Sequence, residues 1–269
     1  MPSRNESQMT EPLFLEERRR AILDDLTKHG RVSVKSLSEQ LGVSAVTIRQ
    51  DLRALEDEGL LERTYGGAVV KQMTPVLSGV TELSFEVRRR KSEEEKQIIA
   101  RAAADLVQDG YGIALDASTT AFAMTPYLKR RDGLTIVTNS LLVAQQFLDT
   151  PRIQVIMPGG RLRRDSVALV GNPSSLPQLH LNLGFFGARG LSLQMGITDI
   201  SPEETEMKRA LLQHCIASVV LIDGSKWGQV TPYTYASVQQ ISRIITTSTA
   251  PSEYVERFRQ AGFEVEIAD

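Results

Sequence analysis

Apolar side chains recur every three or four residues from about Phe14 to Glu58, which is the period of an α-helix. A break at Gly42 separates a short helix over residues 34–41 from a longer one that Ser44 can cap. A short helix, a tight turn with glycine and a longer helix, in that order, are typical of a helix-turn-helix. The first part of the chain is therefore predicted to be such a module.

The last helix of this stretch has two chemically different faces. At about 100° per residue, Ile48, Leu52 and Leu55 fall on one side and predict a buried stripe. The opposite side carries side chains suited to a major groove, because Arg pairs with guanine, Gln with adenine, and small apolar groups touch the thymine methyl. These are Val46, Arg49, Gln50 and Arg53. An ordinary amphipathic helix with a solvated outer face is the alternative interpretation.

A strand-like segment over residues 60–70 follows, and Gly66 and Gly67 between its apolar runs predict a hairpin turn. A hairpin after a helix-turn-helix makes a winged helix, whose wing would bring Arg63 to a phosphate. Residues 31–55 hold four basic and two acidic side chains, a local excess of positive charge. The predicted DNA-binding surface consists of Lys35, Ser44, Val46, Thr47, Arg49, Gln50, Arg53, Arg63, Thr64 and Tyr65.

Farther along the chain, short apolar β-branched runs alternate with helical stretches. The predicted strands are 111–115, 134–138, 153–157, 167–170, 218–222, 241–246 and 263–267. The predicted helices are 93–108, 121–129, 141–148, 203–216 and 252–260, the first with a capping box of Ser92 and Glu95. This alternation predicts an α/β domain with an open, mostly parallel sheet, since seven strands are too few for an eight-stranded barrel. The domain limits are predicted as 13–70 and 85–269, joined by a linker over 71–84.

Composition narrows the possible chemistry. The chain has 269 residues, and its 31 basic and 33 acidic side chains give a net charge of −2, so bulk charge does not indicate nucleic-acid binding. The single Cys215 excludes an intramolecular disulfide and cysteine-based metal clusters, and the three histidines are scattered. With no long apolar run and a polar start, the sequence predicts a cytoplasmic protein with no membrane association, no metal and no cofactor.

Polar clusters follow several predicted strands, which is where ligands bind in open α/β sheets. Hydroxyls and backbone amides over 116–120 suit an anion, and Arg161 and Lys226 suit a phosphate. Each cluster alone could be a cap, a surface turn or, for Glu204 with Lys208, a plain ion pair. Together they favour one shared pocket, made of Asp116, Ser118, Thr119, Thr120, Asn139, Gly159, Gly160, Arg161, Glu204, Lys208, Asp223 and Lys226.

Residues 32–68 resemble the DNA-binding domain of DeoR-type bacterial transcription regulators. The family signature Ser-x-x-Thr-Ile-Arg-x-Asp-Leu stands at 44–52, Leu-Glu-x-x-Gly at 55–59 and Arg-x-x-Gly-Gly-Ala at 63–68. Gln50 departs from the family's usual Arg or Lys, and Tyr65 from its common His. Both departures suggest an altered operator or a weaker hold on phosphate.

The resemblance extends over about residues 14–248 and includes the polar clusters. It implies an effector domain related in fold to ribose-5-phosphate isomerases, in a repressor of a sugar-utilisation operon that a phosphorylated sugar releases from DNA. It also implies that the phosphate binds at Ser118, Thr119 and Thr120, with the sugar hydroxyls or phosphate meeting Asp116, Asn139 and Lys226. Asn182 replaces an Asp of many relatives, which implies a change in the sugar hydroxyl that is recognised.

Two other functions are open to such a chain. An isomerase with an appended DNA-binding domain would need a positioned carboxylate base, and the glycine-rich loop that holds it in the isomerases is absent. A winged helix that binds protein is the other. We expect a regulator with no catalytic residue, whose partners are double-stranded operator DNA, a phosphorylated sugar and itself, as a homodimer or homotetramer on repeated half-sites.

Overall fold

The computed structural model describes residues 14–57, 60–69 and 83–269 and separates into two compact units, Met1–Gln72 and Met73–Asp269. The predicted polar start at 1–12, the helix stop at Gly59 and nearly all of the predicted linker 71–84 lie outside the described residues. The predicted domain limits therefore stay predictions. None of the helices in the described part of the chain has the length and hydropathy of a bilayer-spanning segment.

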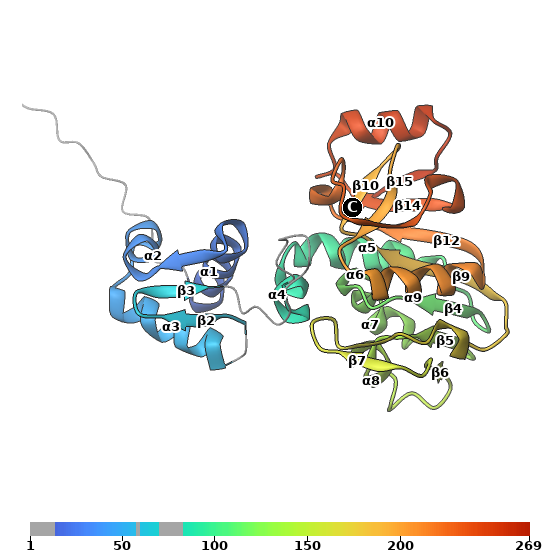
Figure 1. The fold of residues 1–269 in the computed structure, drawn as a ribbon, viewed down its shortest axis with the longest axis horizontal. Coiled ribbons are helices and arrows are strands. Elements are labelled where there is room, and N and C mark those ends of the chain that lie inside the picture. Colours follow the sequence, from blue (N-terminus) through green and yellow to red (C-terminus); the bar gives the residue numbers. More distant parts are fainter. Residues whose placement is uncertain (1–13, 58–59, 70–82) are drawn as a thin grey trace, which may run out of the picture. The chain divides into compact units, whose positions relative to one another are not determined.

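The described part of the first unit contains three helices and a small antiparallel sheet of order β1-β3-β2 (Figure 1). Its elements are α1 (Leu15–His29), β1 (Arg31–Ser33), α2 (Val34–Leu41), α3 (Ala45–Asp57), β2 (Glu62–Thr64) and β3 (Gly67–Val69). Ser33 caps α2, because its hydroxyl accepts a hydrogen bond from the amide of Ser36 at 3.0 Å. The predicted winged helix is confirmed, and β1 is an addition to it.

The second unit is built on a seven-stranded sheet, in which every pair of neighbours is parallel. Its order is β15-β14-β12-β9-β4-β5-β6. The strands are β4 (Gly112–Leu115), β5 (Thr135–Thr138), β6 (Gln154–Ile156), β9 (Leu181–Gly187), β12 (Cys215–Leu221), β14 (Arg243–Thr247) and β15 (Val265–Ala268). The open parallel sheet agrees with the prediction from sequence.

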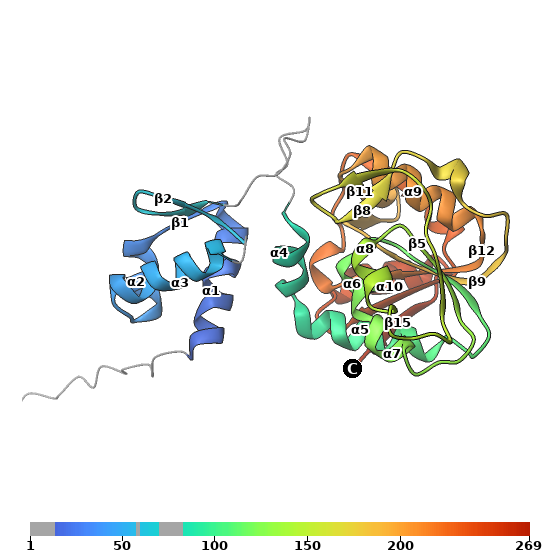
Figure 2. The same cartoon turned by 90° about the horizontal axis from the view of Figure 1, so that it is seen from below.

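Helices cover both faces of this sheet, and an apolar core lies between the sheet and the helices on each face. The helices are α4 (Phe85–Arg90), α5 (Glu93–Asp105), α6 (Thr119–Ala123), α7 (Thr125–Leu128), α8 (Leu141–Gln145), α9 (Pro202–Gln213) and α10 (Ser252–Gln260). Alternate residues of each strand face opposite sides, so Phe185 packs in the core with α5, and Phe186 in the core with α9. Figure 2 shows α9 on one side of the sheet and α5 and α7 on the other.

Two smaller sheets complete the second unit. One pairs β7 (Arg161–Arg163) with β8 (Ala168–Val170), and the other has the order β10-β11-β13. The latter consists of β10 (Gly190–Ser192), β11 (Gly196–Asp199) and β13 (Tyr233–Ala236). The predicted strand 167–170 thus belongs to an antiparallel pair outside the main sheet, and β9 takes its place as the seventh strand.

The predicted capping box at α5 is wrong. Ser92 has φ +52° and its side chain makes no capping hydrogen bond, while Glu95 reaches across to Gly224, Thr247 and Thr249. The predicted helix 93–108 ends at Asp105, and 121–129 is divided into α6 and α7.

Candidate functional site

The outer face of α3 is open to solvent. The side chain of Val46 is 61% exposed, and Arg49, Gln50 and Arg53 are also exposed. Ile48, Leu52 and Leu55 on the opposite face are buried in the core of the first unit. Ser44 caps the helix through a 3.1 Å hydrogen bond that its hydroxyl accepts from the amide of Thr47, and Thr47 is half-buried.

A buried ion pair fixes α3 against α1. Asp51, only 2% exposed, accepts hydrogen bonds from Arg18 Nε at 2.6 Å and Nη2 at 3.2 Å, and from Arg19 Nε at 3.5 Å. The hydrogen bonds to Asp51 raise the pKa of Arg18, against the smaller opposing effect of burial. Asp51 thus faces inward and connects α3 to α1, whereas Arg49, Gln50 and Arg53 of the same helix face the solvent.

The wing lies beside the outer face of α3. Lys35, Arg49 and Tyr65 line one shallow groove, with Tyr65 fully exposed at the turn of the hairpin. Arg63 and Thr64 are exposed on β2, and Arg63 Nε lies 3.8 Å from Glu56, a surface pair that contributes little stability. All ten side chains predicted to contact DNA are thus at least partly accessible.

The second unit contains a cavity at the carboxyl ends of β4, β9 and β12, where ligands bind in parallel sheets. Four of the adjoining helices, α4, α5, α6 and α9, also contribute to its wall. Its lining includes Arg88, Lys91, Lys96, Ser118, Thr119, Thr120, Arg189, Asp199, Glu204, Lys208, Asp223 and Lys226.

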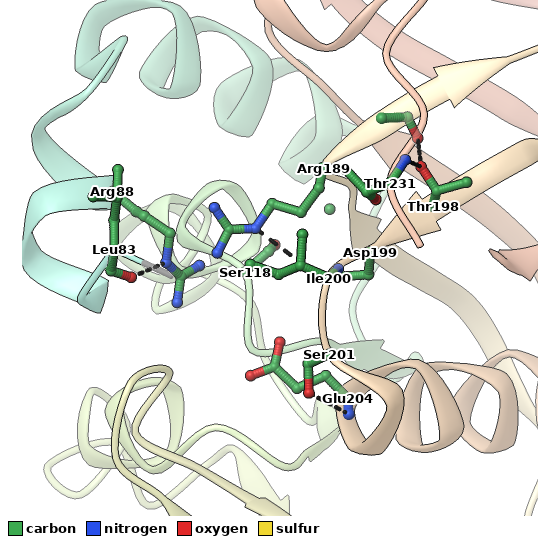
Figure 3. Close-up of polar contacts among 12 residues, drawn as sticks. Leu83, Arg88, Ser118, Arg189, Thr198, Asp199, Ile200, Ser201, Glu204 and Thr231 are labelled. Carbon is green, nitrogen blue, oxygen red and sulfur yellow. Dashed lines mark hydrogen bonds and ion pairs between the residues drawn. The ribbon is translucent and has the colours of Figure 1, made fainter. Parts of the chain in front are cut away.

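Cations from separate elements meet in this cavity. Figure 3 shows Arg88 of α4 and Arg189, which follows β9, extending toward Ser118 from different sides. Arg88 Nε donates to the carbonyl of Leu83 at 3.1 Å, and Arg189 Nε lies 4.0 Å from Asp199. Lys226 also lines the cavity; its ammonium makes no hydrogen bond or ion pair with any described residue, and Asp223 acts on it only through its charge.

Burial lowers the pKa of two lysines in the cavity lining, Lys96 and Lys226. Burial lowers the pKa of Lys96 to about 7, although the charge of Asp223 opposes the change. Burial also lowers the pKa of Lys226, assisted by the like charges of Arg189, Lys91 and Arg88 and opposed by Asp223. An anion in the cavity would relieve this repulsion, because it stabilises both ammonium groups in their charged form.

Lys208 belongs to the lining of the cavity, and its ammonium has three close partners. Its ammonium contacts Asp199 at 2.6 Å, the carbonyl of Gly187 at 2.7 Å and Asp116 at 3.1 Å, and Tyr235 donates to the same carbonyl at 3.1 Å. Burial lowers the pKa of Lys208, but the two carboxylates outweigh it and the net pKa is raised. For Asp199, burial alone would raise the pKa, but the charge of Lys208 outweighs it and the net pKa is lowered. Lys208 therefore joins the ends of β4, β9 and β11.

Two carboxylates give the cavity hydrogen-bond acceptors. Asp223 accepts from the amide of Ser225 at 2.9 Å; burial raises its pKa, but Lys226 and Ser225 more than offset this, so it is ionised. Glu204 Oε1 lies 3.3 Å from Arg163 Nε, and the charge of Glu204 also helps to raise the pKa of Lys208. Carboxylates beside cations suit a ligand with both hydroxyls and a negative charge.

The structure brings seven of the predicted effector residues together at the cavity and places Asp116 beside Lys208. The other four are not part of the lining. The Asn139 amide donates to the carbonyl of Leu169 at 3.1 Å, Gly159 donates its amide to Ser175 at 2.8 Å, Gly160 precedes β7, and Arg161 pairs with Glu203.

The expected role of Asn182 in sugar recognition is not supported by its position. Asn182 lies near the start of β9, and its side-chain oxygen accepts a hydrogen bond from the amide of Gly112 at 2.9 Å. Parallel strands begin at the edge of the sheet opposite to the cavity, so this side chain joins two strands instead of facing a ligand.

Five charged lining residues were absent from the predicted set, namely Arg88, Lys91, Lys96, Arg189 and Asp199. Arg88, Lys91 and Lys96 belong to a run of charged residues that resembles a solvated helix face. Arg189 follows a strand that the sequence did not reveal. If β9 had been recognised in the sequence, the rule that ligands bind at the carboxyl ends of strands would have indicated Arg189 as a site residue.

Comparisons with known proteins agree on one family. The model of the DeoR-like helix-turn-helix domain matches residues 18–74, and that of the DeoR C terminal sensor domain matches residues 91–248. The HTH-type transcriptional regulator GolR of Listeria innocua is 34% identical, over 96% of this chain and 100% of its own. A putative aga operon transcriptional repressor of Escherichia coli O157:H7 is 32% identical, over 93% of this chain and 92% of its own.

A more distant relative and a solved structure extend the comparison. The glycerol-3-phosphate regulon repressor of Escherichia coli K12 is 26% identical over 93% of this chain and 98% of its own. Ribose 5-phosphate isomerase A from Methanocaldococcus jannaschii covers 51% of this chain and 55% of its own at 17% identity, with a TM-score of 0.39. A TM-score of this size supports no statement about activity.

Proposed function

Because this chain belongs to the DeoR family of transcriptional regulators, we propose that it represses an operon for the use of a sugar or sugar derivative and leaves its operator when a phosphorylated sugar binds the cavity. The observation that carries the effector assignment is the meeting of Arg88, Lys96, Arg189 and Lys226 in one cavity beside hydroxyl groups. One relative is named as the repressor of a glycerol-3-phosphate regulon, which supports a phosphorylated ligand.

The two ends of the ligand would meet different chemistry. Guanidinium and ammonium groups bind phosphate through charge-assisted hydrogen bonds, so the phosphate belongs beside Arg88, Arg189 and Lys226. Ser118, Thr119 and Thr120 are within the same lining and can donate hydroxyl hydrogens to it. Asp223 and Glu204 would accept hydrogen bonds from the sugar hydroxyls.

For DNA, we propose that α3 enters the major groove with Arg49, Gln50 and Arg53 toward the bases, while Lys35, Arg63 and Tyr65 contact the backbone. One such module makes few contacts, so at least a homodimer on repeated half-sites would be needed. The effector would favour an arrangement of copies that misplaces their recognition helices, which requires different affinities for the two arrangements. The protein would act in the cytoplasm, associated with the nucleoid while bound.

A thermal-shift screen against phosphorylated sugars, each paired with its unphosphorylated form, tests the effector assignment. Ligand that binds the native state raises apparent stability by mass action, so a phosphorylated compound should raise the Tm and its partner without phosphate should not. The compound that raises the Tm should also release the protein from operator DNA. Equal shifts for both members of every pair would contradict the proposal.

Lys226→Ala should move the response to effector to about tenfold higher effector concentration or beyond, and leave operator binding unchanged. It removes one of the cations that line the cavity, and losing a hydrogen bond to a charged group should weaken effector binding by about tenfold or more. Operator affinity with and without effector measures both effects by fluorescence anisotropy. Lys129→Ala, an exposed change of the same charge, is the control. A Lys226 variant that still responds normally would exclude this residue from the site.

Effector binding should weaken as the pH rises above about 7. Burial lowers the pKa of Lys96 to about 7, and a bound phosphate dianion would raise it, so binding takes up a proton. Affinity should therefore fall between roughly pH 7 and 8.5, by at most about tenfold per pH unit. Lys96→Arg should flatten this profile, because guanidinium stays charged. A wild-type affinity independent of pH in this range would refute the linkage.

We further infer that the domain binds its sugar phosphate without converting it. The relatives are named as regulators and repressors, and Lys208 has its donors engaged by Asp116, Asp199 and Gly187, so it is not available to transfer a proton. A coupled assay for aldose–ketose interconversion of the effector found by the screen should show no turnover. Turnover by the purified protein, lost in Lys226→Ala, would instead identify an enzyme.

A further inference from the structure

Glu95, near the start of α5, contacts two loops that are far away in the sequence. Its Oε2 accepts hydrogen bonds from the amide of Gly224 at 3.2 Å, from the hydroxyl of Thr247 at 2.8 Å, and from the hydroxyl of Thr249. One carboxylate oxygen thus joins α5 to the segment after β12 and to the end of β14. The sequence pattern assigned this carboxylate to a capping box, which the structure does not contain.

The loop after β12, which Glu95 contacts through Gly224, lies beside the cavity. Gly224 begins a short 3-10 helix, Gly224–Lys226, and lies between two lining residues, Asp223 and Lys226. It also packs so closely on the next loop that an added Cβ would lie 2.5 Å from the carbonyl oxygen of Thr249. The two loops are therefore pressed together at the point where Glu95 binds both.

Glu95 itself is not among the residues that line the cavity. Its effect on a ligand would pass through Asp223 and Lys226, which its hydrogen bond to Gly224 holds in place. We propose that Glu95 is a positioning residue of the effector site, which fixes the loop that presents the Lys226 ammonium to the effector's phosphate. This inference rests on the proposed function, since it concerns the same cavity.

Electrostatics and positioning predict opposite results for the loss of this carboxylate. Removing a negative charge near a cationic cavity should by itself strengthen anion binding. Removing the acceptor that holds Gly224, Thr247 and Thr249 should weaken it, because Lys226 is no longer fixed. The direction of the change therefore separates the two effects.

The test measures the affinity of the full chain for inorganic phosphate by isothermal titration calorimetry. Glu95→Ala should weaken phosphate binding by about fivefold or more, whereas Glu94→Ala, an exposed charge-matched neighbour, should leave it unchanged or slightly stronger. Glu95→Gln should recover part of the loss, because its side-chain oxygen can still accept hydrogen bonds. Thr249→Val, which removes one donor without changing charge, should produce a smaller loss.

A double-mutant cycle with Lys226 completes the test. If Glu95 acts through Lys226, then Glu95→Ala should change phosphate affinity by less than about twofold when Lys226 is already alanine. Equal effects in both backgrounds, or tighter binding by a folded Glu95→Ala protein, would overturn the positioning role and leave the proposed function standing. Should Glu95→Ala not fold, the Gln and Thr249→Val variants decide in the same way. Absence of phosphate binding by the wild type would overturn the effector proposal itself, and the positioning role with it.

Discussion

Lys208→Met should destabilise the second unit by about 3–5 kcal/mol, because it removes the cation that contacts both buried carboxylates. Lys208 is 5% exposed and contacts both Asp116 and Asp199 within 3.1 Å. Methionine fills a similar volume, so the loss reflects charge more than packing. Without the ammonium, the pKa of Asp199 rises in the folded state, and the loss of stability should grow as pH rises from about 4 to 7.

Urea unfolding followed by tryptophan fluorescence measures the change in the free energy of unfolding of the second unit. Trp227 is the single tryptophan of the chain and is buried in the second unit. Adding Asp199→Asn to Lys208→Met removes one of the two carboxylates that have lost the lysine, and it should restore part of the stability. A Lys208→Met midpoint equal to that of the wild type at pH 7 would show that the cluster does not need its cation.

Arg49→Ala should weaken operator binding by about 1–3 kcal/mol, which is roughly 5- to 150-fold, and should relax the preference at one base pair. The guanidinium projects from the exposed face of α3 beside the groove that Lys35 and Tyr65 line. A bidentate contact with guanine accounts for the magnitude and for the specificity. Binding to a set of operators with single base changes, measured by anisotropy at fixed salt, reports both.

Lys129→Ala supplies the control for charge, since it lies on the second unit and removes the same charge. The variant Lys35→Ala provides a contrast, because a phosphate contact should weaken all sequences alike and lower the salt slope by about one. If Arg49→Ala bound every operator as tightly as the wild type does, α3 would not be the recognition helix.

The first unit could be predicted because its information is local. Helical periodicity, the cap at Ser44 and the break at Gly42 act within a few residues, and α2 has the predicted bounds. The strand β1 could not be predicted, since Arg31–Ser33 has one buried side chain and gains its place only by pairing with β3. Short elements of this kind depend on partners that are distant in the sequence.

The central strand β9 shows where a sequence pattern fails. Leu181–Gly187 contains two glycines, and glycine weakens the expectation of a strand. Yet a Cβ at Gly184 would lie 2.5 Å from Cys215 Sγ and from the ring of Phe186, so the strand needs glycine there. The reason for the residue is a close approach in the folded domain, which the linear pattern does not contain.

The candidate cavity was predicted in part, for a related reason. Ser118, Asp223 and Lys226 follow strands that the sequence revealed, and the rule of strand ends gathered them. Arg161 seemed equally suitable for a phosphate, but the loop before it leads into β7, and its guanidinium pairs with Glu203. A charged residue shows its chemistry in the sequence, whereas its direction depends on the strand to which it is attached.

The buried ion pair of Asp51 with Arg18 and Arg19 has a consequence for how such regulators diversify. Because α3 is held to α1 from its inner side, substitutions at positions 46, 49, 50 and 53 alter the outer face without disturbing the packing. The scaffold and the recognised sequence can therefore evolve separately. A lineage could acquire a new operator by exchanging a few solvent-facing side chains, while selection keeps the inner carboxylate fixed.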